Sequence, residues 1–76
     1  MKTSGYNKAR ASALQMGREA FARGDKRLAL LDPKLEALYE TWKRVSMKKA
    51  YAVALQWYNG WDRANLAMPV IEIDAT

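Results

Sequence analysis

Hydrophobic side chains recur along most of this chain every three or four residues, which is the period of an α-helix rather than of a strand. Ser4 and Asn7 are suitable N-cap residues near the start, and Gly24 is a suitable residue to end a helix. The pattern therefore predicts a first helix over residues 5–23. Its apolar positions are Tyr6, Ala9, Ala13, Met16, Ala20 and Phe21.

A second helix is predicted over residues 33–45. Asp32 is a good N-cap, and Pro33 fits the first helical position because it has no N–H to satisfy there. Glu40 and Arg44 are four residues apart and predict an ion pair on the surface of this helix. Its apolar face holds Leu35, Leu38, Trp42 and Val45, and the connector before it carries Leu28, Leu30 and Leu31.

A third helix is predicted over residues 47–67. Ser46 can cap it, and the pair Asn59-Gly60 would ordinarily indicate a turn. The apolar stripe continues through that pair, so we expect the helix to continue as well, until Pro69 prevents its extension. The stripe consists of Ala50, Val53, Ala54, Trp57, Tyr58, Trp61, Ala64 and Met68.

The tail over residues 69–76 is β-prone and acidic, and it is expected to be short and extended. Three alternatives are open for it: disorder, folding back on the helices, or addition to the edge of a partner's sheet.

The fold class expected from these elements is all-α, a single small three-helix domain over residues 1–76. Gly17 lies in the middle of the first helix, where it costs about 1 kcal/mol relative to Ala, which indicates that another helix packs closely there. Gly60 opens the backbone of the third helix in the same way. We therefore expect the first and third helices to pack through Gly17, Ala20 and Gly60.

Composition argues against an enzyme. The chain has no Cys and no His, so it lacks thiolate ligands and the commonest metal ligand and general base. Glu36 and Glu40 share a helix face without further catalytic groups, and Ser46 reads as a helix cap. We expect no catalytic residue, no metal and no cofactor. No signal peptide and no apolar run long enough to span a bilayer is visible, so a cytoplasmic location without a membrane partner is expected.

The net charge of +5 lies entirely in residues 1–27, which hold seven basic and two acidic residues, seven minus two. A basic segment of this kind attracts polyanions such as RNA, although it can also be a solvated surface. The candidate phosphate contacts are Lys8, Arg10, Arg18, Arg23, Lys26 and Arg27.

The aromatic residues have two interpretations. Large rings fill the interior of a small helical domain, and this is the more frequent role for Trp57 and Trp61. Rings also stack on unpaired bases of RNA, a role that suits Tyr6 and Tyr58 better. All four are candidates for stacking or for contact with a partner.

Two short motifs resemble the ribosome modulation factor family of small bacterial and phage proteins. The first, Gly-x-x-Ala-x-x-x-Gly, consists of Gly17, Ala20 and Gly24. The second consists of Gln56, Trp57, Gly60, Trp61 and Ala64. The resemblance implies two helices packed through small residues and binding to the small ribosomal subunit near the messenger path, which inactivates ribosomes by promoting their pairing. The chain differs from the family by an added helix at residues 33–45 in place of a short linker.

The expected function is that of a non-enzymatic protein that binds the ribosome or RNA and modulates translation. One alternative is a small inhibitor, encoded by a phage or a mobile element, that binds a host or defence protein. A second alternative is a homodimeric interaction module whose aromatic stripe is its own interface.

Overall fold

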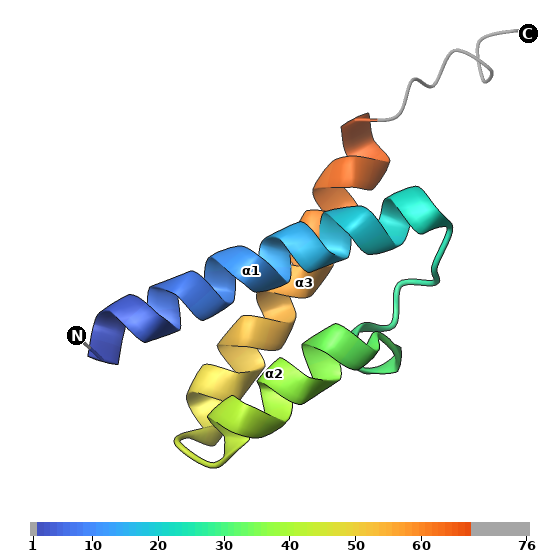
Figure 1. Ribbon diagram of the computed structural model, residues 1–76. Coiled ribbons are helices and arrows are strands. Elements are labelled where there is room, and N and C mark those ends of the chain that lie inside the picture. Colours follow the sequence, from blue (N-terminus) through green and yellow to red (C-terminus); the bar gives the residue numbers. More distant parts are fainter. Residues whose placement is uncertain (1, 68–76) are drawn as a thin grey trace, which may run out of the picture.

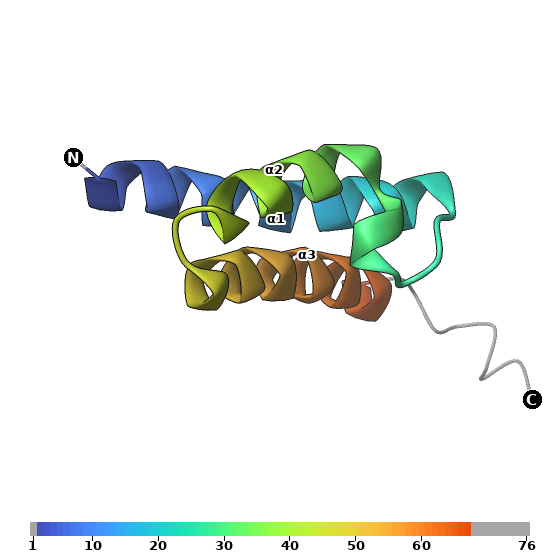
Figure 2. The same ribbon diagram turned by 90° about the horizontal axis from the view of Figure 1, so that it is seen from below.

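The computed structural model describes the backbone of residues 2–67 and the side chains of residues 5–67. It contains three α-helices and, within these residues, no strand, which confirms the all-α fold class. Figure 1 shows α1 and α3 running in the same general direction and crossing, while α2 returns in the opposite direction on one side of the crossing. Seen from below in Figure 2, α1 and α2 form one layer over α3. The elements are α1 (Lys2–Arg23), the short 3-10 turn η1 (Ala29–Leu31), α2 (Pro33–Lys43) and α3 (Met47–Ala67).

The crossing of α1 and α3 is a contact between backbones. A Cβ atom on Gly17 would overlap the carbonyl oxygen of Trp57, and a Cβ atom on Gly60 would overlap the carbonyl oxygen of Leu14. Each glycine therefore admits the backbone of the opposite helix. Ala20, one turn beyond Gly17, is fully buried beside this contact. The predicted packing of the two helices through small residues is confirmed.

Gly24 ends α1 in the left-handed conformation, with φ +86°. The N–H of Asp25 donates to the carbonyl of Ala20 at 2.9 Å, and the N–H of Gly24 donates to the carbonyl of Phe21 at 3.0 Å. These are the two hydrogen bonds that define a Schellman motif. At its other end α1 begins at Lys2, so the expectation that Ser4 or Asn7 caps it is wrong. The helix extends past both residues, because neither Ser nor Asn excludes a helical conformation.

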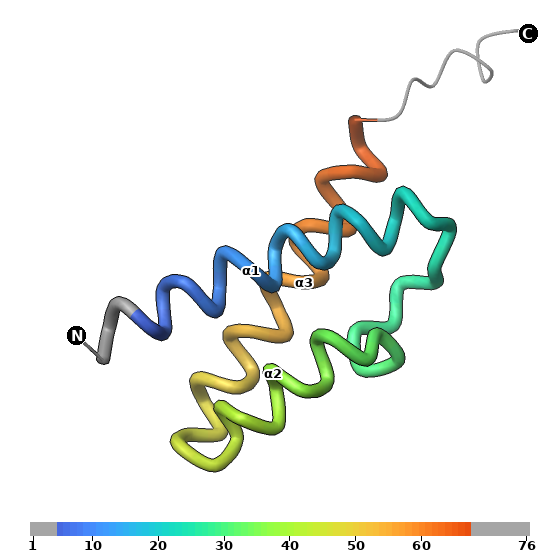
Figure 3. The backbone as a smooth tube through the Cα atoms, in the orientation of Figure 1, coloured from blue at the N-terminus to red at the C-terminus, as the bar shows by residue number. Residues whose placement is uncertain are grey.

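The connector after α1 leads directly into α2, as the tube in Figure 3 shows. Asp32 caps α2 by accepting a hydrogen bond from the N–H of Lys34 at 3.0 Å, and Pro33 occupies the first turn, as the sequence indicates. At the start of α3, the hydroxyl of Ser46 accepts from the N–H of Lys49 at 3.3 Å. That helix runs without interruption through the Asn59-Gly60 pair.

The C-terminal end of α2 differs from the expectation. The helix ends at Lys43, with Arg44 as its C-cap, two residues before the expected end. Val45 therefore lies in the link to α3 and is exposed instead of completing the apolar face. Glu40 pairs with Lys43 at 3.3 Å, three residues away, and not with Arg44, so the expected partner of Glu40 is wrong.

The core is built mostly from small side chains. The large, fully buried side chains are Trp57, Leu35 and Val53. Alanines account for most of the remaining buried apolar positions, at Ala9, Ala13, Ala20, Ala29 and Ala50. Small residues let α1 and α3 approach closely, and as a result they leave little room for large side chains between them. The tail expected at residues 69–76 lies outside the described residues.

We predict that Gly17→Ala destabilises the protein although Ala is the better helix former. The added methyl group would have to displace the backbone of α3, and overpacking of this kind costs about 1–3 kcal/mol. Gly5→Ala is the matched control, because a Cβ atom there meets nothing within 4 Å and should stabilise the helix by up to about 1 kcal/mol. Urea unfolding of both variants measures the difference. Equal stability of the two would contradict the close crossing.

Candidate nucleic-acid interface

Two of the six basic residues predicted to contact phosphate are engaged within the protein. Arg23 donates to the carboxylate of Asp25 at 2.7 Å and also lies 3.7 Å from Asp32. Arg27 forms a two-pronged pair with Asp62 on α3, both N···O distances being 2.7 Å. These ion pairs tie the connector between α1 and α2 to the helices, so the two guanidinium groups have a structural role.

The pairs change the pKa values of their members. The hydrogen bond from Arg27 lowers the pKa of Asp62, with the guanidinium charge acting in the same direction. The hydrogen bond to Asp62 in turn raises the pKa of Arg27, and that to Asp25 raises the pKa of Arg23. Both arginines therefore stay charged, and a neighbouring carboxylate compensates the charge of each.

The remaining predicted phosphate contacts are distributed over three places. Arg10 and Arg18 flank Leu14 at four-residue intervals, so they lie along one side of α1. Lys8 precedes Arg10 by two residues, which turns it about 200° around the helix, on another side. Lys26 belongs to the connector, where it lines a small pocket of about 180 Å³ beside Asp25 and Trp57.

A second basic stripe runs along α3, and the sequence reasoning did not identify it. Lys49, Gln56 and Arg63 are seven residues apart, which places them on one side of the helix. Gly60 lies between the last two and packs against the backbone of residues 14–18 of α1. The two basic stripes are therefore neighbours at the helix crossing. Their regular spacing was a detectable signal, but only the crossing shows that they belong together.

The stripes also meet near the start of α3. The guanidinium of Arg10 lies 4.9 Å from the centroid of the Tyr6 ring, and the ammonium of Lys49 lies 5.3 Å from it. We call this surface the basic face and define it by Tyr6, Arg10, Arg18, Lys49, Gln56 and Arg63. None of its basic side chains enters an ion pair among residues 5–67.

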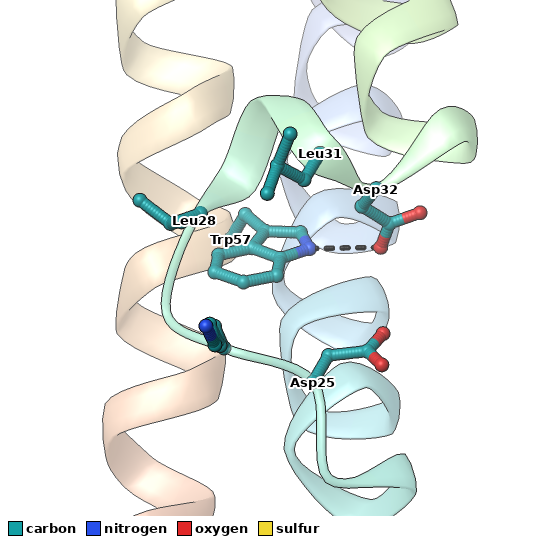
Figure 4. Close-up of a pocket in the computed structure, with 6 residues that line it drawn as sticks. Asp25, Leu28, Leu31, Asp32 and Trp57 are labelled. Carbon is teal, nitrogen blue, oxygen red and sulfur yellow. Dashed lines mark hydrogen bonds between the residues drawn. The ribbon is translucent and has the colours of Figure 1, made fainter.

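Trp57 and Trp61 face the connector. Trp57 is fully buried, and its indole N–H donates to the carboxylate of Asp32 at 3.0 Å. Figure 4 shows its ring enclosed by the connector, with Leu28 and Leu31 beside it and the hydrogen bond to Asp32 drawn dashed. Trp61 is half-buried and donates to the backbone carbonyl of Asp25 at 3.1 Å. Trp57 thus has no surface to offer a base, and both indoles hold the connector in place.

The two tyrosines have different surroundings. The hydroxyl of Tyr58 accepts from the N–H of Ala29 at 3.3 Å, and the guanidinium of Arg27 covers its ring at 4.7 Å. Tyr6 is half-buried and packs against Trp42, with ring centroids 5.4 Å apart. Of the four aromatic candidates, Tyr6 is the one that lies within the basic face.

The small residues of the two motifs surround the crossing. Gly17 and Gly60 form it, Gly24 ends α1, and Ala64 lies half-buried on α3, one turn beyond Gly60. These residues set the separation of the two stripes and offer no functional group themselves.

Within the described part of the chain, no group of three or more acidic side chains gathers in a way that could hold a metal ion. No helix between residues 2 and 67 combines the length and apolar character needed to cross a bilayer.

The chain was compared with protein-family models, with curated proteins and with solved structures, and none of the three comparisons found a match.

Substitution of Asp32 should reveal the hydrogen bond to the buried indole. Asp32→Asn keeps an oxygen to cap α2 but cannot accept from Trp57 with its amide nitrogen, so we expect a loss of about 1–3 kcal/mol from the unsatisfied N–H. Asp32→Ala also removes the cap, which costs about 1 kcal/mol more. Urea unfolding should rank the parent, Asp32→Asn and Asp32→Ala in that order. An Asp32→Asn variant as stable as the parent would show that the indole bond contributes nothing.

The pair of Arg27 and Asp62 should be visible in a titration. Because the pKa of Asp62 lies below its ordinary value of 3.8, the pair stabilises the fold above that pH and loses this contribution as the pH falls through the lower value. Carbon NMR of the Asp62 carboxyl should report this lowered pKa. In Arg27→Gln the pKa should return towards 3.8, and an unchanged value would mean that another group perturbs Asp62.

Proposed function

We propose that this protein is a non-enzymatic binding protein that acts in the cytoplasm, binds RNA of the small ribosomal subunit through the basic face, and thereby modulates translation. The observation that carries the proposal is the convergence of two basic stripes, whose cations enter no ion pair among residues 5–67, at the crossing of α1 and α3. Arg18 and Arg63 enter no ion pair among residues 5–67, so their charges are available to phosphates. Neutralising phosphates releases condensed counterions, which supplies affinity without sequence specificity.

The resemblance to the ribosome modulation factor family supports the same role. Its two motifs supply the glycines of the crossing, Gly17 and Gly60, so the residues shared with the family set the distance between the basic stripes. The basic face is built from α1 and α3 alone. The added helix α2 supplies no residue of the basic face, so its presence leaves the face able to bind RNA.

Tyr6 gives the basic face a means to contact bases as well as phosphates. Arg10 and Lys49 lie near its ring, and when they turn to hold the backbone of a single strand they leave part of the ring to a base. An unpaired base stacked on an aromatic ring contributes about 1–3 kcal/mol and requires no particular sequence. This arrangement favours single-stranded or looped RNA over a regular duplex, whose bases are already stacked.

The double variant Arg18→Gln with Arg63→Gln tests the basic face. We expect it to weaken binding to purified small ribosomal subunits and to single-stranded RNA. The slope of log K against log salt on the single strand should become shallower by about 1.4, or about 0.7 for each lost phosphate contact. Helix content should stay the same, because both side chains are exposed and Gln has a helix propensity similar to that of Arg.

The control is Lys8→Gln with Lys34→Gln, which removes the same charge from exposed positions outside the basic face. It should keep nearly the slope of the parent. If both double variants lose affinity equally, net charge and not the basic face is responsible. If the parent binds neither ribosomal subunits nor RNA and instead recovers one nuclease-resistant protein from a bacterial lysate, the inhibitor alternative replaces this proposal.

A further inference from the structure

The guanidinium of Arg10 carries a buried hydrogen-bond donor that the protein itself does not satisfy. Its Nε–H is the one buried side-chain nitrogen or oxygen among residues 5–67 that has no hydrogen-bond partner. A buried donor without a partner is unfavourable, and folded proteins seldom retain one without a reason. This donor belongs to the basic face, where a ligand that offers an acceptor would remove the deficit.

The other contacts of Arg10 show what holds its guanidinium in this position. The guanidinium lies over the ring of Tyr6 at 4.9 Å, and its Nη2 donates to the side-chain oxygen of Asn7 at 2.9 Å. Neither contact involves a carboxylate. A phosphate offers two charged oxygens to the two prongs of a guanidinium, so it competes well with both contacts.

A phosphate would use the prong that has no partner in the free protein. Nε and one terminal nitrogen of a guanidinium form a planar fork that binds two oxygens of the same phosphate. When Arg10 turns outward to present this fork, its Nε–H leaves the buried position and gains an acceptor. The same movement uncovers the ring of Tyr6, which the guanidinium covers in the free protein.

Two neighbours complete this part of the basic face. The ammonium of Lys49 lies 5.3 Å from the centroid of the Tyr6 ring, so it supplies a second positive charge at the same place. Trp42 packs against the ring at 5.4 Å, and Tyr6 also packs against the hydrophobic core. The ring is therefore supported by the protein when Arg10 moves away. Two cations, an unsatisfied donor and a supported ring lie together.

We propose that Arg10, Lys49 and Tyr6 form a subsite for one nucleotide unit, a phosphate joined to a base. Arg10 binds the phosphate through Nε and a terminal nitrogen, Lys49 adds its charge, and the base stacks on Tyr6. The inference rests on the proposed binding of RNA and specifies which group of the ligand this end of the basic face takes. It also separates Arg10 from the exposed Arg18, which contributes charge alone.

Arg10→Lys and Arg18→Lys form a matched pair of variants, because each removes one fork and keeps the charge. Arg10→Lys should weaken binding to a short oligoadenylate by about tenfold, since an ammonium cannot form two parallel hydrogen bonds with one phosphate. Arg18→Lys should bind within about twofold of the parent, because an exposed charge is preserved. The salt dependence should stay the same in both variants, since the number of neutralised phosphates does not change.

Equal affinities of these two variants would overturn the inference and leave the proposed function intact. If the parent does not bind oligoadenylate or ribosomal subunits at all, the proposed function fails, and the subsite is then decided by the titration with free nucleotide that follows.

NMR of the Arg10 Nε–H in the full chain reports the movement directly. Adenosine monophosphate should shift this resonance through the new hydrogen bond, and it should shift the ring protons of Tyr6 through the stacked base. Inorganic phosphate should shift the Nε–H alone, and adenosine should leave it unchanged. Responses to both adenosine monophosphate and oligoadenylate would show that a free nucleotide can fill the subsite. A response to oligoadenylate alone would assign the subsite to an RNA chain, and no response to either ligand would contradict the inference.

Tyr6→Leu tests the stacked base, and Tyr51→Leu is its control. Tyr51 is exposed and lies two residues from Lys49, which turns it to another side of α3. Tyr6→Leu should weaken binding to oligoadenylate by about tenfold, because the base loses its aromatic support. The response of the Arg10 Nε–H to inorganic phosphate should remain. If Tyr6→Leu binds oligoadenylate as tightly as Tyr51→Leu, no base stacks on Tyr6 and the inference fails.

Discussion

The backbone contact between α1 and α3 is the constraint on which the rest of the structure depends. Gly17 and Gly60 each admit the main chain of the other helix, so the two helices lie closer than any side chain would permit. This approach favours alanines along the contact and leaves Trp57 to fill much of the interior. It also brings the basic stripes of the two helices beside each other. The contact between α1 and α3 thus determines both the small side chains of the core and the position of the surface proposed to bind RNA.

The connector between α1 and α2 is held by hydrogen bonds and an ion pair that no local sequence pattern predicts. Asp32 both caps α2 and accepts from the indole of Trp57, and Trp61 holds the backbone of Asp25. Arg27 reaches Asp62 on α3. The connector therefore stays in place with its leucines turned outward. An apolar segment is thereby held on the outside of the domain.

Much of the fold could be predicted because its signals are local. The 3.6-residue period, the Asp32-Pro33 start and the glycine at position 24 each act within one or two turns. The close helix contact at Gly17 and Gly60 could also be predicted, because a glycine inside a helix is unfavourable unless another segment packs closely against it. The candidate site was less predictable. The pairing of Arg27 with a residue 35 positions away, and the grouping of Lys49 and Arg63 with Arg10 and Arg18, depend on the crossing and not on sequence spacing.

The contact of Gly17 with the backbone of Trp57 joins positions 40 residues apart in the chain. During synthesis, α1 leaves the ribosome first and has no partner until α3 follows. Most of the stability of a helix in a protein comes from the packing of its apolar face, which α1 lacks until α3 is present. At about 5–20 residues per second, α1 must wait several seconds for its partner. A chain built in this way folds late and as one unit, because its first helix is completed by its last.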